Sequence, residues 1–387
     1  MSYQVDPRAQ AIAERINKKY GEGAITVASQ MVIPRRYTSG SLSIDASLNG
    51  GWSANHWAEV YGPENHGKTA ITLKTIAANQ ALDPTFFTLW VASEHYDLDQ
   101  ATALGVDTDR VHVLSTQDMA FAYQTVIDYL QERAADAVVI DSYPALIAPE
   151  EDEKGMDEYT RAEGAKMTNK FFRKVGKAGL RDPLDPGDRP WFGIFINQPR
   201  DSMKSAWTPS GQMPMETTSG GRGKNFAAYT RLEVKRAEWI DEGPKSAKHK
   251  VGQVIRTRAI KHKGGPPQRV ASVDFFFTEA PEHGFSRGDY DIPKDVLTTA
   301  VLFDVVRKAG GWYKFEDRQW QGLPNVIQDV RAEPDLLEHI DKRTREALAD
   351  PRDKRTYDED AVISAATAKT VVRRRKKRGD TDGGSQD

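Results

Sequence analysis

A glycine-rich segment that matches the phosphate-binding loop of nucleotide-binding proteins constrains the fold more than any other feature of the chain. Residues 62–69 read Gly-Pro-Glu-Asn-His-Gly-Lys-Thr, which fills the pattern G-x-x-x-x-G-K-[ST]. A β-prone apolar run at 57–61 precedes the loop, and apolar residues recur at helical spacing over 70–77. This order predicts a strand, a loop and a helix that bind a nucleotide together, and it makes an ordinary Gly-rich turn the weaker interpretation.

The loop would hold phosphates through its backbone and two of its side chains. Glycines let successive N–H groups turn inward, and the start of a helix adds its positive end at the same point. Lys68 is then expected to reach the β- and γ-phosphates, and the hydroxyl of Thr69 to bind Mg²⁺. The residues expected to contact the nucleotide are Gly62, Pro63, Glu64, Asn65, His66, Gly67, Lys68, Thr69 and Ala70.

The segments after the loop predict an α/β fold. Apolar runs of strand length occupy 86–91, 137–141 and 191–196, and they alternate with helical patterns at 118–133 and 160–178. Strands this apolar are covered on both faces, and alternation with helices is typical of parallel sheets. We therefore expect a P-loop α/β core around a mostly parallel central sheet.

Three of the predicted strands end in polar side chains that fit a nucleotide site. In open α/β sheets the ligand lies at the carboxyl ends of the strands. Asp141 ends one strand, where phosphate-loop ATPases hold the Mg²⁺ shell. Glu94 follows another and could polarise the water that attacks the γ-phosphate, although a surface or capping glutamate would look the same. Gln198 follows a third and could touch the γ-phosphate or be a turn amide.

The segment 199–224 has no helical or strand periodicity and is the candidate nucleic-acid-binding loop. It mixes basic residues such as Arg200 and Lys204 with soft or flat apolar ones such as Trp207. Basic groups follow phosphates, and aromatic groups stack on bases. A solvated surface loop would have a similar composition, so both interpretations stay open.

A smaller unit and a polar tail follow the core. Further strands are predicted at 231–236, 253–261 and 269–277. Residues 281–350 change to a small α/β pattern, with a helix near 294–309 stopped by Gly310. From about residue 351 the chain is polar and carries a basic run at 373–378, which is typical of a disordered tail. That run is either simply solvated or a contact for duplex DNA.

Composition excludes several classes of protein. The 387 residues include no cysteine, which removes disulfides and Cys-ligated zinc. No apolar run approaches the length of a membrane span, and the N-terminus lacks the apolar centre of a signal peptide. We expect a cytoplasmic protein without a membrane partner. The net charge of −2 does not decide whether nucleic acid is bound, because local patches do.

Several segments, in the same order along the chain, are similar to the RecA family of homologous-recombination ATPases. They include Ser-Gly-Ser-Leu-Ser-Ile-Asp (39–45), the loop segment 59–69, Val-Val-Ile-Asp-Ser (138–142), Phe-Ile-Asn-Gln (195–198) and Glu-Thr-Thr-Ser-Gly-Gly (216–221). The last two are far more specific than a phosphate-binding loop alone. Because the likeness runs over most of the chain, it bears on the function of every predicted unit.

The resemblance implies an ATPase that uses ATP and Mg²⁺. Glu94 resembles the catalytic glutamate of the family, and Gln198 resembles its γ-phosphate sensor. Lys261 and Lys263 resemble the lysines that reach the ATP of a neighbouring subunit. Their spacing on an alternating strand puts both side chains on one face, which by itself would also fit a surface row of charges.

The resemblance further implies single-stranded DNA, homologous duplex DNA and other copies of the chain as partners. Segments 150–164 and 199–221 resemble the first and second DNA loops, and the helix at 7–20 and Phe226 resemble the subunit interface. The resemblance gives Lys166, Arg173, Arg200, Gly220 and Gly221 as residues expected to contact DNA, and the composition of the loop adds Lys204, Trp207 and Arg222. Trp207 has no counterpart in the family pattern. Residues 281–345 resemble the domain that gates duplex DNA.

These expectations divide the chain into a polymerisation segment (1–36), an ATPase core (37–280), a C-terminal domain (281–350) and a tail (351–387). The implied function is that of an ATP-dependent DNA recombinase, which forms filaments on single-stranded DNA and catalyses pairing and strand exchange in recombination and repair. A RecA-fold DNA helicase-type ATPase is one alternative, although it shares only the core. A DNA-binding member without ATPase activity is the other.

Some residues depart from the family pattern. The tyrosine expected to stack on adenine after Glu94-His95 is missing, and Gln100-Ala101 lie near its place. The first DNA loop is acidic, with Glu150, Glu151 and Asp152 among its residues, and the tail is basic where many members end in acidic residues. Such divergence suits a phage-encoded or otherwise distant member.

Overall fold

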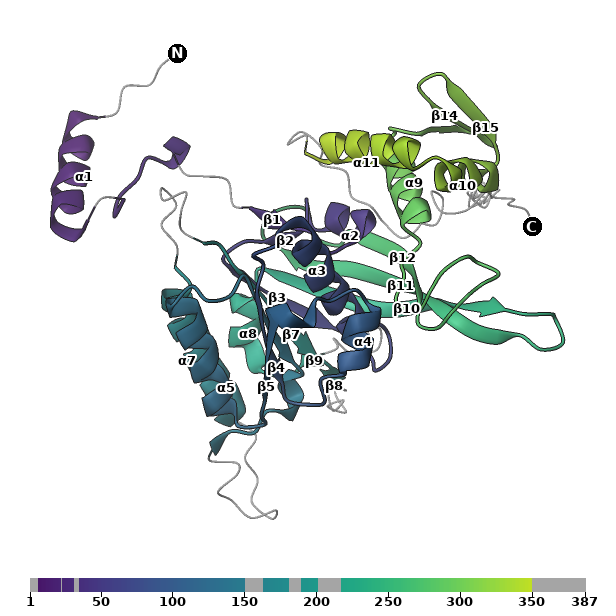
Figure 1. Cartoon of the computed structure of the whole chain (residues 1–387). Coiled ribbons are helices and arrows are strands. Elements are labelled where there is room, and N and C mark those ends of the chain that lie inside the picture. Colours follow the sequence, from purple (N-terminus) through teal and green to yellow (C-terminus); the bar gives the residue numbers. More distant parts are fainter. Residues whose placement is uncertain are drawn as a thin grey trace, which may run out of the picture.

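An eight-stranded mixed sheet forms the centre of the computed structural model, which describes residues 6–21, 23–30, 35–149, 163–180, 189–200 and 217–349 (Figure 1). Its strands are β3 (His56–Tyr61), β4 (Thr88–Ala92), β5 (Val111–Ser115), β6 (Ala137–Asp141), β7 (Phe192–Asn197), β10 (Thr230–Glu242), β11 (His249–His262) and β12 (Val270–Phe276). They lie in the order β12-β11-β10-β3-β7-β6-β4-β5. The strands from β10 to β5 are parallel, and β10, β11 and β12 are antiparallel. The expectation of a mostly parallel α/β sheet is confirmed.

Helices cover both faces of this sheet, as the apolar strands predicted. They are α2 (Leu42–Ser47), α3 (Lys68–Leu82), α4 (Leu98–Ala103), α5 (Met119–Gln131), α7 (Glu163–Ala178) and α8 (Gly221–Ala227). One buried cluster joins α3 to one face of the sheet, and a second joins α5 and α7 to the other. Successive residues of β6 alternate between the clusters: Val139 belongs to the first, and Val138 and Ile140 to the second. This two-sided burial fixes the register of the strands.

An aromatic cluster holds α7 against the sheet. Trp57 on β3 lies beside Gly193 on β7, and its ring meets Phe171 of α7 edge to face at 5.6 Å. A Cβ atom on Gly193 would lie 2.3 Å from Cε3 of Trp57. Only glycine therefore lets the indole lie flat across the neighbouring strand, and α7 is positioned by that ring.

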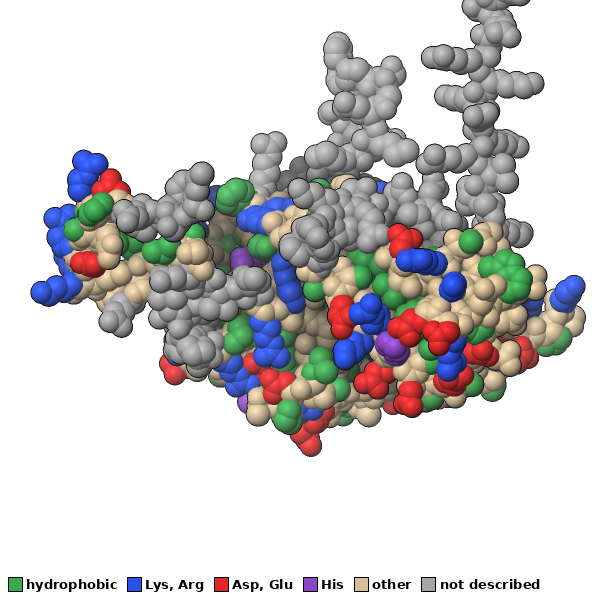
Figure 2. Space-filling view, turned by 90° about the horizontal axis from the view of Figure 1, so that it is seen from above, with side chains coloured by type: hydrophobic (Ala, Val, Ile, Leu, Met, Phe, Trp, Pro, Cys, Tyr) green, Lys and Arg blue, Asp and Glu red, His purple; other side chains and the backbone are tan. Residues whose placement is uncertain are grey.

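Helix α1 (Pro7–Tyr20) stands apart from the sheet in Figure 1. Asp6 caps its first turn, but none of its residues is buried. Its side chains Ile12 and Tyr20 are 48% and 68% exposed. Figure 2 shows apolar and basic side chains side by side on this helix. The described residues therefore leave the apolar face of this amphipathic helix uncovered.

Two short strands, β1 (Arg36–Tyr37) and β2 (Trp52–Ser53), follow α1 in the chain and pair with each other in antiparallel fashion before β3 begins. In the described part of the chain, no helix is long and apolar enough to cross a membrane.

The C-terminal unit packs around a buried cluster that also includes Leu42 of α2, and its local order differs from the prediction. Its elements are α9 (Ile292–Leu302), β13 (Arg307–Ala309), β14 (Trp312–Phe315), β15 (Arg318–Gln321), α10 (Leu323–Ala332) and α11 (Pro334–Leu348). The helix predicted at 294–309 ends at Leu302, because Asp304 takes a left-handed conformation (φ 57°). Gly310, expected to stop a helix, instead lies in the turn between β13 and β14 with φ 60°.

Candidate nucleotide and DNA site

The loop between β3 and α3 has a backbone path that only glycine permits at two points. A Cβ on Gly62 would lie 2.0 Å from the carbonyl oxygen of Val234. Gly67 has φ 102°, and its Cβ would lie 2.5 Å from Cδ1 of Ile255. Asn65 between them is also left-handed, with φ 57°. The loop therefore curls tightly over β10 and β11, as expected of a phosphate-binding loop.

Lys68, the first residue of α3, is a buried cation within this loop. Its side chain is 8% exposed, and its Nζ donates a hydrogen bond of 2.7 Å to the carbonyl oxygen of Pro63. Burial lowers the pKa of Lys68, while Asp141 and Glu64 partly oppose this effect. Nearby, Nδ1 of His66 is buried without a hydrogen-bond partner in the part of the chain described. Both groups can bind a phosphate that lies in the loop.

Thr69, near the start of α3, and Asp141, at the end of β6, meet at the position predicted to hold Mg²⁺. The Thr69 hydroxyl donates to Oδ2 of Asp141 at 3.3 Å. Burial and the neighbouring carboxylate of Glu94 raise the pKa of Asp141 to about 6, although Thr69 and Lys68 oppose the rise. A hydroxyl and a carboxylate fit Mg²⁺, which prefers oxygen ligands and keeps waters and phosphate oxygens. Among the residues described, no group of three or more His, Cys, Asp and Glu could hold a metal by itself.

Glu94 lies just after β4 on the same edge of the sheet. It is exposed, and its Oε1 accepts a hydrogen bond from the hydroxyl of Ser142, the residue after Asp141. The nearby helix α4 is capped by Asp97, so a capping role for Glu94 is not supported. Glu94 is therefore held beside the candidate Mg²⁺ site by a residue that sequence reasoning had not singled out.

Gln198 follows β7, and its neighbour Asn197 connects it to the interior. The backbone N–H of Gln198 donates to Oδ1 of Asn197 at 2.8 Å. Asn197 is buried and donates through Nδ2 to Oε1 of Glu59 at 2.9 Å and to the carbonyl oxygen of Ser219 at 3.0 Å. The strand end is thus tied both to the strand that precedes the phosphate-binding loop and to the segment that leads into α8.

Lys261 and Lys263 lie at the end of β11, against α8. Nζ of Lys261 donates to the carbonyl oxygens of Asn225 and Phe226 at 2.6 and 3.0 Å, and Nζ of Lys263 lies 5.4 Å from the centre of the Phe226 ring. Burial, Lys263 and Arg231 lower the pKa of Lys261 to about 8. The loop contacts β11 at Ile255, so at about 3.3 Å per residue Lys261 lies roughly 20 Å further along the strand. It cannot reach the loop of its own subunit.

The residues expected to contact DNA gather around α7 and α8 as far as they are described. Lys166 and Arg173 are exposed on α7, and Gly220 and Gly221 turn into α8 with φ of 100° and 72°. A groove of about 690 Å³ runs between the two helices and includes Arg173 and Phe226 in its lining. Phe226 is 80% exposed. Lys204, Trp207 and the side chains of Arg200 and Arg222 lie outside the described residues, as do most of the first DNA loop and the tail.

A buried ionic cluster next to this region was missed by sequence reasoning. Lys224, the last residue of the segment 199–224 predicted to be a nucleic-acid-binding or solvated loop, is 1% exposed, as is Glu59 on β3, and the two form an ion pair. Arg231 of β10 donates from Nε to the other oxygen of Glu59 at 2.6 Å. The signal in the sequence was a single glutamate inside the apolar run 57–61, because a buried carboxylate requires a partner.

Comparisons with known proteins extend over nearly all of the described chain. Residues 8–281 match the family model of the RecA N-terminal domain, and residues 294–349 match that of the RecA C-terminal domain. The chain is 30% identical over 342 residues to Protein RecA of Staphylococcus aureus (strain JH9), which covers 87% of this chain and 91% of that protein. The same values hold for Protein RecA of strain Newman. A match to the C-terminal domain does not favour the helicase-type alternative.

Both the architecture and these matches lead to one assignment. The two family models together span the core and the C-terminal unit, and the mixed, mostly parallel sheet is consistent with their fold. The chain therefore belongs to the RecA family of recombination and repair ATPases.

Proposed function

We propose that this protein is an ATP-dependent recombinase that assembles on single-stranded DNA and exchanges it with a homologous duplex. The observation that carries the proposal is the convergence of the phosphate-binding loop, Asp141, Glu94 and Gln198 at the carboxyl ends of β3, β6, β4 and β7. ATP is hydrolysed there to ADP and phosphate. The family makes a DNA-dependent ATPase the general expectation, and the residue roles below are our proposals.

The loop residues 62–70 hold the triphosphate. Lys68 leaves the Pro63 carbonyl oxygen for the β- and γ-phosphates, and Thr69 and Asp141 hold Mg²⁺ together with phosphate oxygens and waters. Mg²⁺ supplies positive charge against the charge that develops on the phosphates. Asp141, whose pKa is raised by burial and by the carboxylate of Glu94, would be favoured in its charged form by a cation held there.

Glu94 acts as the general base toward the attacking water. Its carboxylate is exposed, so water can reach it, and the Ser142 hydroxyl fixes one of its oxygens. Gln198 contacts the γ-phosphate and passes its presence through Asn197 to the segment before α8. The end of β7 would then contact both the nucleotide and the segment that binds DNA.

Neighbouring copies complete the site. Lys261 and Lys263 are too far from the loop of their own subunit, which supports a role at the ATP of the next one. The uncovered apolar side chains of α1 and Phe226 supply further contact area for a filament. Within this scheme, residues 1–36 serve polymerisation, 37–280 the ATPase core, 281–350 the C-terminal domain and 351–387 the tail, and the protein works in the cytoplasm.

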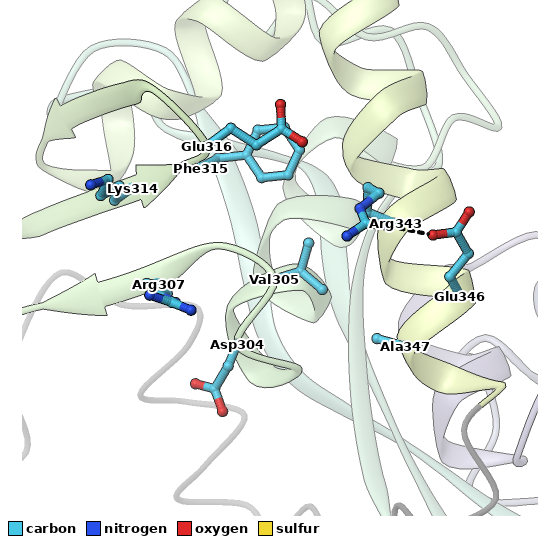
Figure 3. Close-up of a pocket in the computed structure, with 9 residues that line it drawn as sticks. All are labelled: Asp304, Val305, Arg307, Lys314, Phe315, Glu316, Arg343, Glu346 and Ala347. Carbon is cyan, nitrogen blue, oxygen red and sulfur yellow. Dashed lines mark hydrogen bonds and ion pairs between the residues drawn. The ribbon is translucent and has the colours of Figure 1, made fainter.

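DNA binds along α7 and α8, and the C-terminal unit receives the duplex. Lys166 and Arg173 offer exposed charges to phosphates, and Gly220 and Gly221 let a strand approach the backbone. In the C-terminal unit, Figure 3 shows Arg307 and Lys314 on two neighbouring strands among the residues that line a pocket, with residues of α11 on another side of it. These two cations lie directly opposite each other on β13 and β14, an arrangement that a phosphate between them would stabilise.

The test of the proposed chemistry separates binding from turnover. Glu94→Gln should bind ATP and assemble on single-stranded DNA like the wild type, but hydrolyse ATP slower by about 10²–10⁴-fold, the range for general acid–base catalysis. Lys68→Ala should lose nucleotide affinity itself. Wild-type turnover in Glu94→Gln would contradict the assignment of the base. Hexameric rings instead of filaments in electron micrographs would favour the helicase-type alternative.

The trans role of the lysines has its own test. A Lys261→Ala/Lys263→Ala variant should bind nucleotide as an isolated subunit yet show little DNA-stimulated ATPase. Mixing it with an excess of Lys68→Ala subunits should restore part of the hydrolysis, because intact loops then face intact lysines. Mixed filaments without any restored activity would mean that the lysines act within their own subunit or not at all.

A further inference from the structure

The ionic cluster of Glu59, Lys224 and Arg231 lies between Gln198, proposed to contact the subunit's own ATP, and Lys261, proposed to contact the ATP of the next subunit. The catalytic steps proposed above do not involve this cluster. Glu59 belongs to β3, Lys224 to α8 and Arg231 to β10. The carboxylate accepts from Lys224 and Asn197 on one oxygen and from Arg231 on the other. One buried anion therefore joins three separate elements.

Both carboxylate oxygens of Glu59 and the amine of Lys224 have hydrogen-bond partners, which holds the two buried charges in fixed positions. Lys224 donates to Glu59, to the hydroxyl of Thr218 at 2.9 Å and to Oδ1 of Asn225 at 3.1 Å, so all three ammonium protons are used. Arg231 also donates to the Thr218 hydroxyl, at 3.2 Å. Moving one side chain of such a buried network would leave another side chain without its hydrogen-bond partner, which is costly in a low-dielectric interior. A shift of one member is therefore expected to shift the others.

The cluster connects the γ-phosphate side of the subunit to its opposite side. On one side, Asn197 links Glu59 to the backbone of Gln198. On the other side, Lys224 is bonded to Asn225, whose carbonyl oxygen holds Lys261 at 2.6 Å. The path therefore runs from the residue that meets the subunit's own γ-phosphate to the lysine that meets the ATP of the neighbour.

We propose that Glu59 and Lys224 are positioning residues that couple occupancy of a subunit's own ATP site to the placement of α8, and through it of Lys261 at the next ATP site. This inference rests on the proposed function, since it assigns the means by which one subunit responds to both nucleotides that it touches. A movement of the Gln198 backbone would move Asn197, whose amide and the amine of Lys224 donate to the same oxygen of Glu59. Lys224 then carries the change into α8.

Lys224→Met is the variant that tests the coupling with the least disturbance. Met fills the space of the lysine stem, which packs where a Cβ on Gly220 would lie 2.9 Å from Cδ of Lys224. Glu59 keeps its ion pair with Arg231, so no buried charge is left uncompensated. Lys294→Met is the matched control, because Lys294 is also ion-paired and partly buried, with Asp274 of the edge strand β12 at 2.6 Å.

The first measurement is the affinity for single-stranded DNA in the presence of a non-hydrolysable ATP analogue, divided by the affinity in the presence of ADP. The second is the affinity for the Mg²⁺–nucleotide complex in the absence of DNA. In Lys224→Met the ratio should fall by about fivefold or more, the range of allosteric coupling, while nucleotide affinity stays within about twofold. Lys294→Met should leave both unchanged. Thr218→Val, which removes only the shared hydroxyl, should lower the ratio in the same direction and serves if Lys224→Met does not fold.

The outcomes distinguish this inference from the function on which it rests. If the wild type binds single-stranded DNA equally with both nucleotides, the proposed function fails and the coupling fails with it. If the wild type discriminates but Lys224→Met and Thr218→Val keep its ratio, the cluster only stabilises the fold and the inference is overturned. If the affinity ratio fell equally in Lys224→Met and Lys294→Met, the effect would come from a less stable fold, and the inference would likewise be overturned.

Discussion

A buried histidine between the two candidate trans lysines should make the stability of the fold depend on pH. His262 is 7% exposed, and its Nδ1 lies 2.9 Å from the hydroxyl of Thr230. Its Nε2 has no hydrogen-bond partner in the part of the chain described. Burial, followed by the charges of Arg36 and Arg269, lowers the pKa of His262 from 6.5 to about 4. The ring is therefore neutral in the folded protein at physiological pH.

The sign and size of the effect follow from this shift. An unfolded chain takes up the proton near pH 6.5 and the folded chain only near pH 4, so the stabilisation is complete above pH 6.5 and is lost as the pH falls between these values. The full difference is about 3.5 kcal/mol, since the shift is about 2.5 pKa units and each unit is worth about 1.4 kcal/mol. About 2 kcal/mol of it should disappear between pH 7 and pH 5.

His262→Asn isolates this residue from every other titrating group. Asn keeps an acceptor for the Thr230 hydroxyl but does not titrate. The assay is urea unfolding of both proteins at pH 7 and pH 5, followed by tryptophan fluorescence. Between pH 7 and pH 5, the free energy of unfolding of the wild type should fall by about 2 kcal/mol more than that of the variant. Equal losses would show that the proton on His262 is not excluded from the fold and would refute the reasoning.

Two further predictions test the DNA surface and the packing behind it. Arg173→Ala should weaken single-stranded DNA binding and reduce the slope of log affinity against log salt by about 0.7, the value for one lost phosphate contact, whereas an unchanged slope would place Arg173 outside the interface. Gly193→Ala puts a Cβ 2.3 Å from the Trp57 ring and should destabilise the fold by about 1–3 kcal/mol in urea unfolding, while Gly311→Ala, which meets nothing within 4 Å, should be neutral.

Local patterns were sufficient to predict the nucleotide site but not the contacts that connect it to the rest of the subunit. Gly67, Lys68, Asp141 and Glu94 could be placed from sequence, because parallel strands bring their carboxyl ends to one edge of the sheet. Their roles as nucleotide, metal and catalytic residues stay predictions. The glutamate of β3 was read as part of an apolar run, because its partners come from α8 and β10, far along the chain.

The same limit explains the errors outside the site. The strand predicted at 231–236 extends over Thr230–Glu242. Its second half pairs with β11 in a long hairpin, and this pairing holds the strand together without alternating apolar residues. The helix predicted at 294–309 was too long, because Val305 and Val306 continue its apolar pattern while packing in the core of the C-terminal unit. Apolar periodicity predicts what is buried but not where the backbone turns.

Lys68 and Lys261 show why assembly and nucleotide should stabilise each other. Both amines donate to backbone carbonyl oxygens, which satisfy hydrogen bonds but do not neutralise charge, and burial lowers the pKa of both. Each lysine is a partly desolvated cation without a full counter-charge in the free subunit. The triphosphate would neutralise Lys68 of its own subunit and, in the proposed filament, Lys261 of the neighbour. One ligand then offsets a desolvation cost in two subunits, so ATP should favour the assembled state over the free one through linkage alone.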